Sequence, residues 1–211
     1  AFRILDPSKR IDLVYGYGEY DFDAPNFYLK FAQGKLNYLI SRNTFSDFYN
    51  YYVYSNRTIK EQTLNFSLAE KQALFNYLET NYKPENRAYL YDFFYDNCAT
   101  KIRDVDLEAA DRKIDFITPT NFEPKTFREL IHDHVGLNTW GSFGIDIALG
   151  SVIDRTATAY EHLFLPDYIF RFFEVAKIEK SQNLVRQSST LFNAKTNETA
   201  FVDFIWSPVV V

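Results

Sequence analysis

The pattern of apolar and polar residues at the start of the chain predicts antiparallel β-structure. Residues 2–5 and 11–17 have strand-like composition, and the turn-forming residues 6–9 separate them. Gly16 and Gly18 flank one residue near the end of the second segment, so we expect a bend or a bulge there. Further strands are expected over residues 36–40 and 58–65.

Helical periodicity next appears after Ser67. Ser67 and Glu70 form a capping box, and the apolar residues that follow share one helix face before Pro84 ends the helix. The aromatic segment 45–54 fits a helix or a strand, and we expect a helix. The residues on the apolar face after Ser67 are Leu74, Phe75, Leu78 and Tyr82.

Two more helices are expected in the second half of the chain. Thr126 and Glu129 make another capping box, which opens a helix that Gly136 closes. Pro166 stands at the first position of a last, aromatic helix. Residues 177–199 are polar and predict a loop.

Composition and charge narrow the class of protein. The 211 residues are 46% hydrophobic, which is enough for one core-bearing domain, or for one domain with an appendage. With 21 Phe and 16 Tyr, composition alone favours a core filled with rings over an aromatic-lined acyl groove. The net charge is −5 and no run of Lys or Arg occurs, which argues against a nucleic-acid partner and against a polybasic membrane patch.

The few cysteines and histidines limit the chemistry further. Cys98 is the single cysteine, which excludes an internal disulfide framework and a CxxC metal knuckle. No HExxH motif or Cys/His spacing accompanies the three histidines, so we expect no metal and no cofactor. His134 shares a helix face with Phe127 and is expected to line the core, whereas His132 points elsewhere. A packing or surface role is expected for these two histidines and for His162.

Cys98 stands at the start of a predicted helix. Asp96 or Asn97 is a good N-cap, which puts Cys98 in the first turn. There the unpaired N–H groups and the positive end of the helix dipole stabilise a thiolate and can hold an oxyanion. The thiol also belongs to an apolar stripe at helical spacing and is expected to face the interior or a cleft. The stripe consists of Cys98, Ile102, Val105 and Ala109.

The pattern alone supports two interpretations of Cys98 equally. One is an activated nucleophile, and the other is a small buried thiol that packs like alanine. Asn97 fits the N-cap and also fits a side-chain oxyanion donor. Asp92 and Asp104 lie on either side of the start of this helix. Three roles fit each of them: a helix cap, an ion-pair partner for Arg103, or a carboxylate that orients a catalytic base. We expect a structural role for Asp104 and leave that of Asp92 open.

Four short segments together carry a family resemblance. They are residues 21–28 (DFDAPNFY), 91–104 (YDFFYDNCATKIRD), 144–151 (GIDIALGS) and 164–168 (FLPDY). They resemble the Lnb-type periplasmic domain, a family typical of Bacteroidetes and long catalogued only as a domain of unknown function. The likeness runs from residue 1 to roughly residue 173, and the Asp-Asn-Cys segment is its most specific part.

This resemblance implies a fold and a chemistry. The implied fold is α+β: a circularly permuted papain-like core of the NlpC type, with an antiparallel sheet packed on the helix that carries Cys98 and extra C-terminal helices. Lnb proteins are similar to lipoprotein N-acyltransferases, which move an acyl chain through a cysteine thioester to the N-terminal amine of a lipoprotein. Cys98 is then the expected nucleophile, with Asn97, Asp96 and Asp92 in supporting roles. The implied base is a histidine of a Gly-His pair upstream of Ala1.

The resemblance also implies a domain organisation and a location. Residues 1–176 are the expected catalytic domain, and residues 177–211 a polar extension that leads towards a membrane segment beyond the sequence. The apolar residues 204–211 are far fewer than the ~20 that span a bilayer, and they fit a last strand equally well. The expected site of action is the periplasmic face of the bacterial inner membrane. Expected partners are the membrane, a phospholipid or lipoprotein acyl donor and a lipoprotein amine acceptor.

Two other functions compete with acyl transfer. A cysteine hydrolase of a peptide or lipid amide would use the same thioester and differ only in whether water or an amine reaches it. A non-catalytic binding domain would use Cys98 only for packing.

Overall fold

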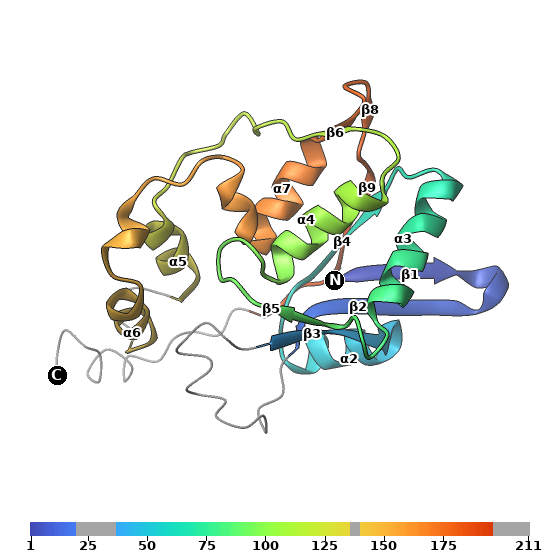
Figure 1. Ribbon diagram of the computed structural model, residues 1–211, viewed down its shortest axis with the longest axis horizontal. Coiled ribbons are helices and arrows are strands. Elements are labelled where there is room, and N and C mark those ends of the chain that lie inside the picture. Colours follow the sequence, from blue (N-terminus) through green and yellow to red (C-terminus); the bar gives the residue numbers. More distant parts are fainter. Residues whose placement is uncertain (20–36, 136–139, 196–211) are drawn as a thin grey trace. The chain divides into compact units, whose positions relative to one another are not determined.

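The computed structural model describes residues 1–19, 37–135 and 140–195 (Figure 1). Within these ranges the chain is α+β, with six α-helices and with antiparallel pairing in every sheet. The chain groups into two compact units, Ala1–Pro119 with Leu163–Ala194, and Thr120–His162 with the residues from Lys195 on. The family-like segment 21–28, the helix-closing Gly136 and the apolar residues 204–211 lie outside the described ranges.

A four-stranded antiparallel sheet organises the first unit, in the order β1-β2-β3-β5. The turn between the first two strands forms as predicted, because the Asp6 carboxylate accepts the N–H groups of Ser8 and Lys9. The register of β2 on β3 shifts between Tyr17 and Glu19, which confirms the predicted bulge. The strands are β1 (Phe2–Asp6), β2 (Ile11–Glu19), β3 (Asn37–Thr44) and β5 (Ala88–Leu90).

Three of the four helices of the first unit begin at a residue whose side chain caps them, and the fourth, α7, begins with a proline. Thr44 accepts the Asp47 N–H at 3.2 Å, which explains why the ambiguous aromatic segment forms a helix. Both halves of the predicted box of Ser67 and Glu70 are present, and Pro166 takes a first-turn position as expected. The helices are α2 (Phe45–Tyr54), α3 (Leu68–Asn81), α4 (Cys98–Ala109) and α7 (Pro166–Val175).

Helix α4 lies at the centre of this unit. It contacts β2 as well as α3 and α7, and these neighbours surround it in Figure 1. Tyr15 of β2 and Leu78 of α3 are fully buried, and Phe172 of α7 is 2% exposed. The core thus combines aromatic rings with aliphatic side chains, as the composition predicts.

The Arg3 guanidinium ties the strands of the first unit to a helix. It bonds the Asp12 carboxylate through Nε at 2.8 Å and the Glu61 carboxylate through Nη1 at 2.9 Å. Its plane also lies 3.4 Å from the centre of the Phe45 ring. One side chain of β1 therefore connects β2, α2 and the strand that contains Glu61.

Residues 177–199 are not simply a loop, so that prediction is wrong for the part described here. Strand β9 (Val185–Phe192) pairs with β4 (Ile59–Leu64), and β7 (Lys177–Ile178) pairs with β6 (Ile114–Asp115) and β8 (Gln182–Asn183). The residues of β9 are mostly exposed, and only its first residue, Val185, is buried. Polar composition indicated a loop because a two-stranded ribbon with solvated faces needs few apolar residues.

In the second unit, helices α5 (Phe127–Val135) and α6 (Trp140–Leu149) are joined through Arg128. The Arg128 guanidinium pairs with Asp146 of α6 and, at 2.6 Å, with Asp154 of the 3-10 helix η2 (Gly150–Asp154). The capping box of Thr126 and Glu129 is present as predicted.

The histidine expected in the core is exposed, so that prediction is wrong. Phe127, Leu130 and Ile131 of α5 are buried, but His134 lies in the exposed last turn of the helix. There its Nδ1 is 2.9 Å from the Leu130 carbonyl oxygen. Residues 133–135 at the end of this helix are all exposed, so a side chain there does not reach the core whichever helix face it shares.

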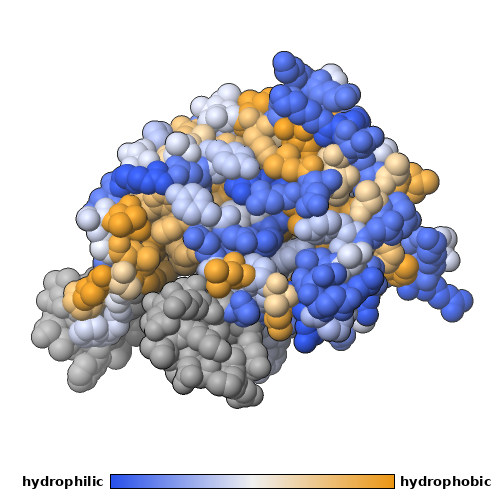
Figure 2. All heavy atoms as spheres, viewed as in Figure 1, coloured by the Kyte–Doolittle hydropathy of each residue, from blue (hydrophilic) through white to orange (hydrophobic). Residues whose placement is uncertain are grey.

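Helix α6 presents an apolar surface. Trp140, Phe143 and Ile147 are about half or more exposed, and Figure 2 shows hydrophobic surface over this helix. Among the residues that the structure describes, no helix combines the length and the hydropathy needed to cross a membrane.

The buried carboxylate of Glu70 is held by a cation. Its two oxygens bond the Arg112 guanidinium at 3.0 and 2.6 Å, and Oε2 also accepts the Ser67 N–H at 2.7 Å. These hydrogen bonds, first of all those from Arg112, lower the pKa of Glu70 to about 2.

We expect Glu70→Gln to destabilise the protein at pH 7 by about 2 kcal/mol, because the variant loses charged hydrogen bonds. A lowered carboxyl pKa stabilises the fold above the pKa of the unfolded state, and that stabilisation is lost as pH falls towards the folded value. The free-energy difference between wild type and variant, measured by urea unfolding, should therefore shrink from pH 5 to pH 2. A difference that stays constant over that range would contradict the assignment.

Candidate active site

A short turn leads from β5 into α4 and sets the position of Cys98. The Asp92 carboxylate accepts the N–H groups of Phe94 and Tyr95, both at 2.9 Å. The backbones of Asp92 and Asp96 bond each other in both directions, at 3.2 and 3.1 Å. Asp92 therefore shapes the turn as a side chain of the Asx type.

Asn97 is the N-cap of α4, and its side chain is fully committed to that role. Oδ1 accepts the N–H groups of Ala99 and Thr100 at 2.8 and 3.0 Å. Nδ2 donates to the carbonyl oxygens of Phe93 and Phe164 at 2.8 and 2.9 Å. Both amide hydrogens are used and the residue is 4% exposed, so its geometry is that of a cap and leaves no hydrogen for an oxyanion.

Cys98 is the first residue of α4 and its side chain is exposed. The expected stripe exists, but burial increases along it, so that Val105 and Ala109 are buried while the thiol is not. Of the two expected surroundings of the thiol, the interior is wrong, because the side chain is exposed, and a cleft stays a prediction. The Cys98 N–H has no hydrogen-bond partner within the described ranges, since the cap uses the next two N–H groups.

Residues of the sheet lie close to the thiol. A Cβ built on Gly18 of β2 would come within 3.3 Å of the Cys98 Cβ, and Gly18 has a φ of +101°. Burial raises the pKa values of Tyr89 and Tyr91, and the next largest cause for both is the negative charge of Cys98. Helix α4 therefore begins against the ends of β2 and β5.

Lys101 neutralises the nearest acidic side chain. Its ammonium is 2.7 Å from the Asp96 carboxylate, and it also lies 4.7 Å from the centre of the Tyr89 ring. Asp96 is thus an ion-pair partner, whereas Asn97 supplies the cap. Asp104 pairs with Arg103 at 2.6 and 2.9 Å, which is the structural role expected of it.

Asp106, a buried carboxyl on the same helix, is not among the residues predicted from the sequence. Asp106 is 1% exposed, and neither carboxyl oxygen has a hydrogen-bond partner among the residues described. Burial raises its pKa well above the usual value, and the nearby nitrogen of Ala1 acts in the opposite direction. Asp106 is eight residues from Cys98, so the helical stripe through Ile102 includes it; this signal was available.

The start of β1 approaches both groups of α4. The nitrogen of Ala1 is buried and lies within electrostatic reach of Cys98 and Asp106. Figure 1 shows the start of β1 beside α4.

The contacts of the three histidines lie within the second unit. His132 Nε2 is 3.0 Å from both Asp146 oxygens, and His162 is fully buried with its Nδ1 2.7 Å from the Thr158 carbonyl. His162 Nε2 accepts the Lys125 N–H at 3.2 Å. His162 thus has the packing role expected of it, and the general base of Cys98 stays a prediction.

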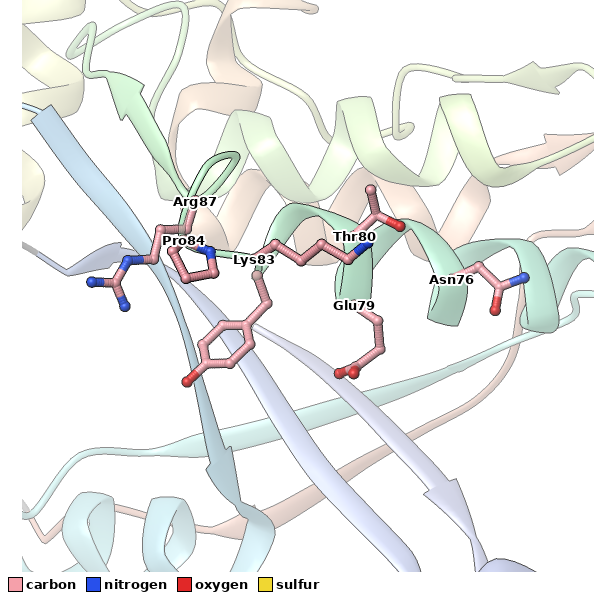
Figure 3. Close-up of a pocket in the computed structure, with 7 residues that line it drawn as sticks. Asn76, Glu79, Thr80, Lys83, Pro84 and Arg87 are labelled. Carbon is pink, nitrogen blue, oxygen red and sulfur yellow. The ribbon is translucent and has the colours of Figure 1, made fainter.

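Cys98 does not line the pocket that the structure shows on α3. No group of three or more His, Cys, Asp or Glu side chains in the described ranges could hold a metal ion. A pocket of about 550 Å³ lies at the C-terminal end of α3 (Figure 3). Its basic side chains, Lys83 and Arg87, point in different directions and do not converge on one point. The pocket is lined by Asn76, Glu79, Thr80, Tyr82, Lys83, Pro84 and Arg87.

Comparison with known proteins identifies one family. Residues 5–133 match the family model of the Lnb N-terminal periplasmic domain. No curated protein and no solved structure matches the chain.

We expect Gly18→Ala to disturb the start of α4. The φ of +101° strains any residue with a side chain, at a cost of about 1–3 kcal/mol, and the added methyl would meet Cys98. The melting temperature should fall, and the alkylation rate of Cys98 by iodoacetamide should change with it. Gly150→Ala is the control, because Gly150 also has a positive φ but open space around it. Equal alkylation rates in both variants would contradict a specific contact at Gly18.

Asp106→Asn should alter how stability depends on pH. In wild type the unfolded carboxyl ionises near pH 4, but the folded one keeps its proton, so stability falls as pH rises from there towards the folded pKa. The amide of the variant has the same shape and no such proton. Thermal melts from pH 4 to pH 8 should therefore favour the variant increasingly. Parallel curves for the two proteins would show that Asp106 is ionised when folded.

Proposed function

Because the chain belongs to the family of Lnb N-terminal periplasmic domains, we propose that it is a thiol-dependent acyltransferase with Cys98 as its nucleophile. The observation that carries this proposal is an exposed thiol at the first residue of a capped helix, where the Cys98 N–H has no partner in the described part of the chain. The dipole and the free N–H groups of a helix start favour a thiolate over a thiol.

The proposed reaction has two steps. The Cys98 thiolate attacks the carbonyl carbon of an acyl ester, and the π-electron pair of the C=O bond moves to the oxygen. The Cys98 N–H can donate a hydrogen bond to the oxyanion that this creates. The electron pair on the oxyanion then re-forms the C=O bond, and the ester C–O bond breaks. The alcohol leaves with the proton that a base had taken from the thiol. An amine then attacks the thioester, the new C–N bond replaces the C–S bond, and the amine proton passes to the base.

The surroundings of Cys98 suit an acyl substrate. Phe93 and Tyr95, in the turn before α4, are 41% and 54% exposed. Aromatic rings at such a boundary can contact an apolar chain on one side and water on the other. The proposed acyl donor is a phospholipid or a lipoprotein, and the proposed acceptor is the N-terminal amine of a lipoprotein.

The finer parts of the fold and location belong to this proposal. We infer a circularly permuted papain-like core, supported by the approach of Ala1 to Cys98 at the start of β1. In such a core the base is a histidine upstream of Ala1. The family is one of periplasmic domains, and we propose the periplasmic face of the inner membrane as the site of action. Three neighbours support the proposed nucleophile. Asn97 caps its helix, Asp96 forms an ion pair with Lys101, and Asp92 shapes the turn before the helix.

Hydrolysis is the second candidate, because Cys98 is exposed and water can reach its thioester. An amine acceptor distinguishes the two reactions: a transferase forms the amide in preference to the free acid. Acylation states of lipoproteins in cells with and without the full-length protein would identify the physiological reaction.

Cys98→Ala should abolish formation of the acyl-enzyme while leaving the melting temperature within a few degrees of wild type. The measurement is intact mass after incubation of the full-length protein with an activated acyl ester, which reports directly on the single cysteine. Cys98→Ser should be equally inactive, because a serine hydroxyl is far less acidic than a thiol.

A relocated thiol is the matched control. The double variant Cys98→Ala/Leu107→Cys places an exposed cysteine in the last turn of the same helix, where the dipole opposes a thiolate. It should be acylated at least about tenfold more slowly than wild type. Equal rates would indicate that any exposed thiol suffices, and a wild-type Cys98 without reactivity would favour the binding domain.

A further inference from the structure

Helix α6 has its polar side turned towards the protein. Asp146 forms an ion pair with Arg128 and lies 3.0 Å from His132 Nε2, and both of these partners belong to α5. Ser142, one turn earlier on the same helix face, is buried. Asp146 is the single charged residue among the 10 residues of α6. The side of the helix that contacts α5 therefore carries the whole charge of α6.

The opposite side of α6 is apolar and exposed. Trp140, Phe143 and Ile147 share one helix face; the first two are about half exposed, and Ile147 is 68% exposed. Gly144 and Ala148 lie on the same face and are exposed as well. This arrangement is the reverse of the usual surface helix, whose apolar side faces the core and whose charged side faces water. An apolar face turned outwards in this way indicates a contact with something other than water.

The size and the charge of this face limit what can cover it. Together with the exposed Val152 of η2, its large side chains present roughly 400 Å² of apolar surface, since a whole aromatic side chain has about 150–250 Å². A stable dimer buries about 800 Å² on each partner, so this face is too small to hold a second copy. A bilayer needs no matching shape, and no charge on this face would lose its water on entering one.

We propose that the apolar face of α6 is a lipid-contacting surface, with Trp140, Phe143 and Ile147 lying in the interfacial layer of a phospholipid bilayer. The helix is about 15 Å long, which is too short to cross a bilayer but sufficient to lie along its surface. Because the chain has a net charge of −5, the contact is apolar, and uncharged lipids suit it better than anionic ones. The inference deepens the proposed action at the inner membrane, on which its biological role rests, but lipid contact itself needs no reactive thiol.

Tryptophan fluorescence tests this contact, because Trp140 and Trp206 are the two tryptophans of the chain. In the 211-residue chain with Trp206→Phe, vesicles of brominated phosphatidylcholine should quench the emission of Trp140. The quenching should persist from about 0.05 to 0.5 M salt, since salt screens charges and not apolar contacts. Cys98→Ala in the same background should be quenched equally. Quenching without acylation of Cys98 would overturn the proposed nucleophile and support the lipid-contacting surface.

Ile147→Glu in this background should weaken vesicle binding about tenfold, because it removes apolar contact and adds a charge that the bilayer would desolvate. Leu68→Glu is the matched control. Leu68 is 84% exposed at the first residue of α3, in the other compact unit, so this variant should bind like Trp206→Phe alone. The melting temperatures of both variants should stay within a few degrees of that background, since both side chains are exposed.

Three results would each overturn the lipid-contacting surface: no quenching of Trp140, quenching that disappears at high salt, or equal weakening of vesicle binding by Ile147→Glu and Leu68→Glu. A dimer that Ile147→Glu dissociates, measured by sedimentation without vesicles, would also overturn it and would assign the face to a second copy of the chain.

Discussion

The side chain of Asn97 is the constraint on which the candidate site depends. Its oxygen closes the start of α4, and its nitrogen holds both the turn before the helix and the carbonyl of Phe164, close to the start of α7. One buried amide therefore joins three segments with four hydrogen bonds. The cap uses the N–H groups of Ala99 and Thr100, and the N–H of Cys98 has no partner among the described residues. The same bonds that stabilise the helix thus set which N–H group the proposed reaction can use.

Local rules predicted most elements of the fold. The boxes at Ser67 and Thr126, the turn after Asp6 and the first-turn Pro166 all place helices and strands where the structure has them. The failures have two causes. Strand β9 needs β4 to form its ribbon, and that pairing is not encoded within a few residues of the strand. His134 is exposed because its helix ends there, although the helix end itself was predicted from the sequence, and the helix face alone did not reveal the exposure.

The candidate site was predicted only where one segment carries it. Cys98 and its cap are adjacent in the sequence, so residue type and capping rules made Cys98 a candidate, and the family resemblance favoured a nucleophile over a packed thiol. Tyr89 and Gly18 come from other strands, and only the pairing of β2 with β3, and of β3 with β5, brings them to the helix. Asp106 is an intermediate case, because it lies on the same helical stripe but has an acidic side chain that a search for apolar residues passes over.

The charges around Cys98 are compatible with a thiolate because the acidic groups nearby are neutral or paired. Burial raises the pKa values of the Tyr89 and Tyr91 phenols and of the Asp106 carboxyl, which favours their neutral forms, and Lys101 balances Asp96. A carboxylate or phenolate without a partner at this place would oppose the anion that the start of a helix attracts. For the nucleophile proposed here, the exclusion of competing anions therefore matters more than an added cation.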